Sequence, residues 1–303
     1  MSRSAAASLA ENPTVKSMII RRGVDGAIPR RFIAGEQRHE ALQVVKGIKE
    51  DEANASLEYL GENFTTEEDT ESSVAEYVEV IKAVSAFYPD TVVSVKLTAI
   101  GLATDPKLAL TNLNRLMDEA CGRGNVFLRV DMEGSENVDS IIKIVREVRS
   151  KKANIGGVLA AHLRRTDRDL DQLLGLEMPL RLVRGSYDES PKVAFTRKDE
   201  IDAAYRRQMF RLLDSTTFHT IATHDTGMIE AAKLYTKKRN IPQYRFEFEL
   251  PLGGNPSLQQ SLIDDGYRVR VNVPYGEAWF PYLVRSLGES DMSGPALMLG
   301  LLK

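Results

Sequence analysis

Charged and polar side chains follow most of the short apolar segments of this 303-residue sequence. They are Lys96, Asp131, His162 with Arg164 and Arg165, Arg184 with Tyr187, His224 with Asp225, and Glu249. Burying so many charged groups without partners would be costly, so we expect them to converge on a wet or ligand-filled cavity. The alternative is that each pairs with a neighbour in a structural ion network. Positive groups are numerous in this set, and they suit an anionic cofactor or a carboxylate substrate.

Hydrolytic and metal chemistry find less support in the sequence. There is no G-x-S-x-G nucleophile motif, and the single cysteine, Cys121, is expected to be inert at the end of a helix. A metal site built from His224, Asp131 and Glu249 is conceivable, but no H-x-H or H-E-x-x-H pattern supports it. We therefore expect no bound metal.

The elements that must position these residues alternate between short β-branched segments and longer helical stretches. The predicted strands lie at 92–97, 126–131, 157–162, 180–185, 220–224, 244–249 and 267–273, with an earlier candidate at 31–34. The predicted helices between them include 106–121, 138–150, 198–213 and 226–238. Most strands look like nearly continuous apolar runs, as in a parallel sheet covered on both faces.

Eight such units predict an α/β fold of the (β/α)₈ TIM-type barrel class, whose site forms at the carboxyl ends of the strands. The alternative is an open doubly wound sheet, but the sequence has neither a G-x-G-x-x-G motif after the first strand nor a Walker A motif. Residues 40–54 and 67–87 are predicted to be charged amphipathic helices outside the barrel. We expect one domain over residues 1–303, with 1–30 as an N-terminal helical extension.

The composition is that of a globular protein, with 43% hydrophobic and 27% charged residues. A net charge of −3 gives no reason to expect nucleic acid binding. No apolar run approaches the roughly 20 residues that span a bilayer, and the N-terminus lacks the apolar core of a signal peptide. A lone cysteine fits a reducing compartment, so we expect a cytoplasmic protein, with peripheral membrane contact left open.

An ordered series of short motifs runs along nearly the whole chain. They are RFIAGE at 31–36, LEYLGE at 57–62, SVKLT at 94–98, VDME at 130–133, RLVRGSY at 181–187, ATHD at 222–225, VPYG at 273–276 and WFPYLVR at 279–285. Each motif alone is a weak match, but their order is specific. In this ordered series the sequence resembles the bacterial monofunctional proline dehydrogenases, as a divergent member.

The resemblance implies an FAD enzyme with a distorted barrel, in which hydride passes from a substrate carbon to flavin N5. By position, Lys96 and Asp131 would stand near the reacting centre, and Arg181 would approach N5. The substrate wall would hold Tyr187, Tyr282 and Arg285, with Glu62 as the ion-pair partner of Arg285. The cofactor would contact Asp131, Ala160, His162, Arg181, Val183, Arg184, Gly185, Ser186, Thr223 and His224.

The sequence also departs from the family pattern around the expected substrate cavity. The family's pair of adjacent arginines is Arg285-Ser286 here, and a tyrosine is replaced by Asn272. Other departures are Ala160 and His162 in place of a glutamine and a tyrosine, Arg184 in place of a lysine, and a less apolar segment at 248–252. Asn272 and Ser286 would make the substrate cavity larger and less positive.

Three functions remain open at this point. The first is an FAD-dependent dehydrogenase that oxidises an amino or imino acid other than free L-proline. The second is an ordinary L-proline dehydrogenase that gives 1-pyrroline-5-carboxylate, and the third is a catalytically weak barrel with a binding or regulatory role. Either enzyme would pass its electrons to an acceptor such as a quinone or oxygen.

Overall fold

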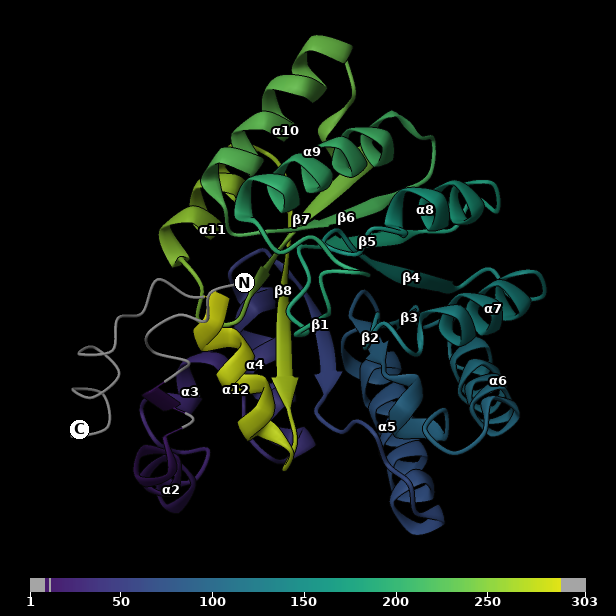
Figure 1. Cartoon of the computed structure of the whole chain (residues 1–303), viewed down its shortest axis with the longest axis vertical. Coiled ribbons are helices and arrows are strands. Elements are labelled where there is room, and N and C mark those ends of the chain that lie inside the picture. The colour runs from purple at the N-terminus through teal and green to yellow at the C-terminus, as the bar shows by residue number, and fades with distance from the viewer. Residues whose placement is uncertain (1–8, 11, 290–303) are drawn as a thin grey trace.

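Eight parallel strands close into a barrel in the computed structural model, which describes residues 9–10 and 12–289 (Figure 1). The strands are β1 Asn54–Tyr59, β2 Val92–Val95, β3 Leu128–Val130, β4 Ile155–Ala160, β5 Leu180–Val183, β6 His219–Ala222, β7 Phe246–Pro251 and β8 Arg268–Tyr275. Each strand pairs with the next in sequence, and β8 pairs with β1. The predicted barrel is confirmed, and the doubly wound alternative is wrong.

Helices join the strands on the outside of the barrel. They are α5 Glu67–Phe87, α6 Pro106–Gly122, α7 Val138–Arg149, α8 Thr166–Leu174, α9 Lys198–Asp214, α10 Thr226–Arg239 and α11 Pro256–Asp264, with short 3₁₀ turns η1 Leu97–Ile100 and η2 Gln243–Arg245. Local signals explain several starts: Thr66 and Asp225 cap α5 and α10 through their side-chain oxygens, and Pro106 opens α6. No helix among the described residues combines the length and apolar character that crossing a bilayer requires.

The predicted first strand at 31–34 is wrong. The helix α3 (Pro29–Phe32) occupies this segment, beginning with a proline that suits the first turn of a helix. The first strand is instead β1, 20 residues further along the chain, where no strand is predicted. Its polar Ser56 and Glu58 alternate with Ala55 and Leu57, so it lacks the continuous apolar character of the predicted strands.

The interior of the barrel is polar, contrary to the prediction that most strands are apolar throughout. In β7, Phe246 and Phe248 belong to the apolar core, whereas Glu247 and Glu249 form ion pairs inside the barrel with residues of β3, β5 and β8. Successive residues of a strand point to opposite faces, so such alternation separates the outer apolar layer from an inner charged one. The same alternation recurs in β8.

Three further helices give the barrel its irregular shape. The helix α4 (Arg38–Glu50) packs over β1 and β8, which confirms the helix predicted at 40–54. With that outer face covered, the last helix α12 (Trp279–Glu289) lies beside α3 instead, with α2 (Pro13–Arg22) close by (Figure 1). A second apolar cluster holds these helices together, and it includes Ile19, Phe32, Leu60, Trp279 and Leu283. Residues 1–8, 11 and 290–303 of the predicted single domain lie outside the described residues.

Candidate functional site

A buried triad of charged residues lies at the carboxyl ends of the first three strands. The ammonium of Lys96 lies 2.6 Å from a carboxylate oxygen of Glu58 and 3.0 Å from one of Asp131. Each of the three side chains is less than 10% exposed. The predicted neighbours Lys96 and Asp131 are thus brought together, and Glu58 joins them from β1.

Lys96 keeps its positive charge in this triad. Burial disfavours its ammonium, but Asp131 and Glu58 together raise the pKa of Lys96 well above its ordinary value. Burial likewise opposes the charge of Glu58, yet contact with Lys96 holds the pKa of Glu58 below its ordinary value. Burial raises the pKa of Asp131, and the negative charge of Glu58 adds to this rise. Asp131 is therefore the carboxyl of the triad that takes up a proton more readily.

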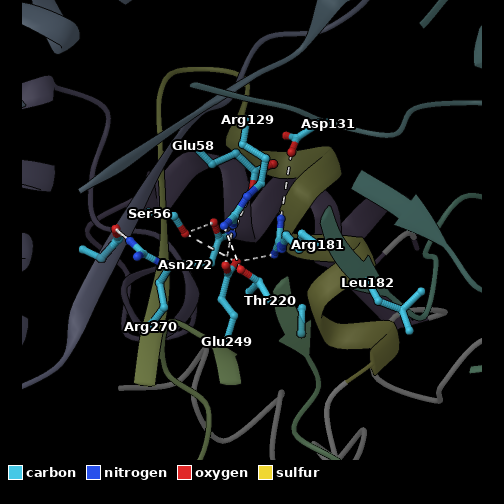
Figure 2. Close-up of polar contacts among 12 residues, drawn as sticks. Ser56, Glu58, Arg129, Asp131, Arg181, Leu182, Thr220, Glu249, Arg270 and Asn272 are labelled. Carbon is cyan, nitrogen blue, oxygen red and sulfur yellow. Dashed lines mark hydrogen bonds and ion pairs between the residues drawn. The ribbon is translucent and has the colours of Figure 1, made fainter. Parts of the chain in front are cut away.

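Two arginines converge on the carboxylate of Glu249 in the middle of the barrel (Figure 2). Arg181 Nη2 lies 2.7 Å from Glu249 Oε1, and Arg129 Nη1 lies 2.7 Å from Glu249 Oε2. Arg181 also approaches Asp131, at 3.9 Å. Burial disfavours the Arg181 cation, but Glu249 and Asp131 more than offset this and leave the pKa of Arg181 raised. Glu249 is thus an interior residue of the barrel, and it belongs to the predicted site.

Asn272 takes part in this buried network. Its amide Nδ2 donates to Glu58 Oε2 at 2.7 Å, and its Oδ1 accepts the hydroxyl of Ser56 at 3.1 Å. The side chain is therefore tied to β1, and the whole residue is 4% exposed. Asn272 supports the carboxylate that pairs with Lys96.

A second polar group lies at the mouth of the barrel, where Glu62 meets Arg285. The two form an ion pair at 3.0 Å, as the resemblance implied, and the hydroxyl of Tyr187 donates to the other oxygen of Glu62 at 2.8 Å. The guanidinium of Arg285 lies over the ring of Tyr187, 5.2 Å from its centre. Burial opposes the charge of Glu62, but Arg285 and Lys96 keep the pKa of Glu62 below its ordinary value.

Separate segments position these three residues. Glu62 follows β1, and Arg285 lies on α12, whose apolar side is held by Trp279 and Leu283. Tyr187 lies in the loop between β5 and α9, which Glu189 anchors by accepting hydrogen bonds from the backbone and hydroxyl of Ser135. Arg285 can bind a carboxylate, because a guanidinium presents two parallel N–H donors to the two carboxylate oxygens.

Tyr282 and Ser286 lie on the same helix as Arg285, and both are half-buried. Tyr282 packs against the second apolar cluster and contributes to the charge environment of Arg181. Ser286 is the immediate neighbour of Arg285, where the family pattern has a second arginine. Their contacts with a substrate remain predictions.

Buried polar atoms without partners lie in β5 and just after β4. Among the described residues, Arg181 Nε and both ring nitrogens of His162 are buried atoms without a hydrogen-bond partner. Burial lowers the pKa of His162, so its imidazole is neutral at pH 7. Gly185 adopts a φ of +103°, and the His162 ring lies so close that a Cβ there would be 1.8 Å from Nδ1. The missing Cβ of Gly185 thus leaves room for the His162 ring, and the unpaired nitrogens of His162 and Arg181 are groups that a polar ring system can contact.

The other expected cofactor residues lie at the carboxyl ends of β4, β5 and β6. Ala160 and Val183 pair across β4 and β5. Arg184 is held by Asp202 at 2.7 Å, Ser186 is half-buried and His224 is exposed. The hydroxyl of Thr223 accepts the backbone N–H of Asp225, just before α10. The expected residues therefore follow neighbouring strands, and their contacts with a cofactor remain predictions.

Some residues of the initial set do not join the site. Arg165 forms ion pairs with Asp139 and Asp169, and Arg164 lies over the ring of Phe195 at 4.5 Å. For Arg165 the alternative of a structural ion network is correct, whereas Arg164 packs on an aromatic ring instead. Among the described residues, no group of His, Cys, Asp and Glu side chains is arranged to hold a metal ion.

Sequence analysis missed Glu58 and Arg129 as members of the site. Each stands between apolar residues in a short strand, Leu57 and Tyr59 in one case and Leu128 and Val130 in the other. A charged residue at the alternating position of a barrel strand must face the interior, because helices cover the outside. Reading β1 and β3 for this alternation would have identified both residues.

Comparison with known proteins gives a consistent result. The family model described as "Proline dehydrogenase" matches residues 41–293. "Proline dehydrogenase 1" of Bacillus subtilis subsp. natto is 33% identical over 274 residues, covering 90% of each chain. "Proline dehydrogenase" of Deinococcus radiodurans is 31% identical over 306 residues, covering 99% of this chain and 98% of the other.

A solved structure has the same fold. Proline utilization A (PutA) from Bdellovibrio bacteriovorus superposes with a TM-score of 0.82 at 24% sequence identity. The match covers 95% of this chain but 35% of that one, so this chain spans about a third of the larger protein.

Proposed function

Because the chain belongs to the proline dehydrogenase family, we propose that it is an FAD-dependent dehydrogenase that oxidises an amino or imino acid at the carbon next to nitrogen. The observation that carries this proposal is the pairing of Arg285 with Glu62 at the mouth of a barrel whose interior holds Lys96, Asp131 and Arg181. Arg285 can bind a substrate carboxylate, and the charged residues of the interior can accept or stabilise the charge of a reacting amine.

The residues at the ends of β4 to β6 fit FAD as the cofactor. Arg181 Nε and the ring of His162 are buried polar groups without partners, and Gly185 lets the His162 ring lie against the backbone. His162, Arg184, Thr223 and the other residues of these strand ends would hold it. When bound, FAD supplies the acceptor for the hydride that leaves the substrate.

Asp131 and Lys96 have different roles in this account. Hydride loss requires a neutral amine, because the nitrogen lone pair becomes part of the product imine. Asp131 accepts the proton that the substrate ammonium gives up, since burial raises the pKa of Asp131. Lys96 stays protonated and holds Asp131 and Glu58 in place.

Arg285 binds the substrate carboxylate, which replaces Glu62 as its partner. The exchange leaves the net charge at the arginine unchanged, because one carboxylate substitutes for another. Tyr187 lies against the same guanidinium and would contact the substrate, together with Tyr282 on α12. The mouth of the barrel thus selects for an acid, and the interior selects for an amine.

The preferred substrate in this proposal is an amino or imino acid other than free L-proline. Ser286 removes one cation from the carboxylate site, and loss of one charge-assisted contact costs on the order of 1.5–3 kcal/mol. Glu249 adds a carboxylate beside Arg181 in a segment that is more apolar in the family pattern. The second candidate is ordinary oxidation of L-proline to 1-pyrroline-5-carboxylate, which the presence of Arg285, Glu62 and Tyr187 favours.

The electron acceptor in either case is proposed to be a quinone or oxygen. A quinone would bring the enzyme to a membrane surface from the cytoplasm. Oxygen consumption and quinone reduction by the substrate-reduced protein distinguish these two acceptors.

Two measurements on purified protein test the proposal. The cofactor released by heat is identified by its absorption spectrum and by conversion to FMN with a phosphodiesterase, which is expected for FAD. The protein is then mixed without oxygen with cyclic and linear amino acids and their N-substituted derivatives, and bleaching of the flavin is followed. Bleaching fastest with a compound other than L-proline supports the first candidate, and bleaching by L-proline alone supports the second. Protein that binds no flavin would favour a binding or regulatory barrel.

A further inference from the structure

A continuous series of ion pairs runs along the axis of the barrel. It begins near the amino ends of the strands, where Arg270 Nε lies 2.7 Å from Glu247, and Glu247 lies 3.6 Å from Arg129. Arg129 then pairs with Glu249, and Glu249 pairs with Arg181, each at 2.7 Å. The series ends in the triad at the carboxyl ends of the strands, through the 3.9 Å approach of Arg181 to a carboxylate.

The members of this series balance one another in charge. Four cations face four carboxylates: Lys96, Arg129, Arg181 and Arg270 against Glu58, Asp131, Glu247 and Glu249. All eight side chains are at most 12% exposed. A buried charge without a partner costs several kcal/mol, so removing one member changes the field acting on its neighbours.

Glu249 connects the ion pairs near the amino ends of the strands to Arg181 and the proposed reacting centre. It is the carboxylate nearest to Arg181 among the described residues, because the next one, Asp131, is 1.2 Å further away. Glu249 depends in turn on Arg129, which binds its second oxygen, and on a weaker contact from Ser56 at 3.4 Å. Figure 2 shows Arg129 and Arg181 reaching Glu249 from two sides.

We propose that Glu249 and Arg129 are positioning residues that fix Arg181 and set the electrostatic potential it exerts on the bound flavin. This inference rests on the proposed function, in which Arg181 lies beside the cofactor. The negative charge of Glu249 reduces the positive potential around Arg181, and the positive charge of Arg129 offsets part of that reduction. The two residues therefore act on the flavin with opposite signs.

The sign of each effect follows from charge. Reduction places electron density on the flavin, and positive potential nearby stabilises the reduced form. Glu249→Gln removes a negative charge and should raise the midpoint potential. Arg129→Gln removes a positive charge and should lower it. For each, we expect at least a tenfold change in the equilibrium constant for reduction, which is about 30 mV for a two-electron couple.

The series keeps both variants partly paired. With Glu249→Gln, Arg129 retains Glu247 and Arg181 retains Asp131. With Arg129→Gln, Glu249 retains Arg181, and Glu247 retains Arg270. Either single variant suffices for the test if the other yields no folded protein, because each has its own expected sign.

The matched control is Glu247→Gln. Glu247 has the same side chain, lies two residues earlier on the same strand, is equally buried and also pairs with Arg129. Its removal should lower thermal stability as much as Glu249→Gln does, but it should shift the midpoint potential less than a third as far. A merely structural role for Glu249 predicts that the two variants behave alike in both measurements.

The experiment measures the flavin midpoint potential of the purified holoenzyme by reductive titration against a reference dye, together with its melting temperature. Potentials that rise with Glu249→Gln, fall with Arg129→Gln and stay near the wild-type value in the double variant support the inference. Shifts of the same sign, shifts smaller than threefold in the equilibrium constant, or an equal shift with Glu247→Gln overturn it. Absence of bound flavin in the wild-type protein would instead contradict the proposed function.

Discussion

Glu62 and Arg285 form an ion pair at 3.0 Å although they are 223 residues apart in the sequence. The barrel brings the segment after β1 to the same end as α12, where Tyr187 contacts both side chains. An arginine held by an acid at the opening of a barrel can exchange that acid for the carboxylate of a substrate.

Arg285→Met should weaken the binding of carboxylate substrates. Loss of a charge-assisted contact of about 1.5–3 kcal/mol predicts a fall in kcat/KM of about one to two decades, chiefly through KM. Steady-state kinetics with a substrate and with its analogue lacking the carboxylate measure the effect. Arg207→Met is the control, since Arg207 lies on α9 and pairs with Asp167 on α8. An equal loss for both compounds would show that Arg285 does not bind the carboxylate.

Ser286→Arg should restore a second cation for the substrate carboxylate. We expect KM for L-proline to fall by about one decade, the value of one such contact. Ser286→Ala, which changes the side chain without adding charge, should leave KM near the wild-type value. A KM for L-proline that is unchanged in the arginine variant would mean that Ser286 does not limit carboxylate binding.

The two carboxyls beside Lys96 should contribute to the pH dependence of stability with opposite signs. The pKa of Glu58 is lowered in the folded protein, so its contribution is present above its unfolded pKa of about 4.3 and is lost in acid. The pKa of Asp131 is raised, so its ionisation costs stability as pH rises above its unfolded pKa of about 3.9.

Thermal unfolding between about pH 3 and pH 8 tests these signs. Relative to wild type, Asp131→Asn should gain stability as pH rises, and Glu58→Gln should lose stability as pH rises. A tenfold difference in proton affinity between the folded and unfolded protein corresponds to about 1.4 kcal/mol of unfolding free energy. Parallel curves of stability against pH for the wild-type protein and both variants would contradict the opposite pKa shifts of Glu58 and Asp131.

Gly185→Ala should reduce the amount of bound flavin. A side chain at φ +103° is strained by about 1–3 kcal/mol, and the new Cβ would collide with the ring of His162. The flavin-to-protein absorbance ratio measures cofactor content. Gly175→Ala at the end of α8 is the control, because a Cβ there meets its nearest atom at 3.6 Å and φ is −60°. Full flavin content in the Gly185 variant would remove this turn from the cofactor site.

The sequence pattern was sufficient for the barrel and for seven of its eight strands, and the family resemblance implied the ion pair between Glu62 and Arg285. The first strand escaped because Ser56 and Glu58 give β1 a polar face. A strand was wrongly predicted at 31–34 because Phe32 and Ile33 are apolar, but their apolar character serves a different contact. Both pack in the second cluster with α12, outside the barrel.

The charged interior was harder to predict than the fold. A single strand such as β3 shows that Arg129 alternates with apolar residues, but its partner Glu249 is 120 residues away. Such pairing depends on the register of a closed sheet, which brings β3 and β7 to opposite walls of one interior. The position of α12 could not be predicted from the sequence either. It depends on a tertiary contact, the packing of α4 over β1 and β8.

Anaerobic reduction of the bound flavin tests the proposed hydride transfer directly when the fastest substrate of the panel carries deuterium at the carbons next to nitrogen. Stopped-flow absorbance measures the rate of bleaching at saturating substrate. Hydride transfer from that carbon predicts that the labelled compound bleaches the flavin several-fold more slowly than the unlabelled one. Flavin that stays oxidised with every amino and imino acid of the panel would show that the protein is not a dehydrogenase of these compounds.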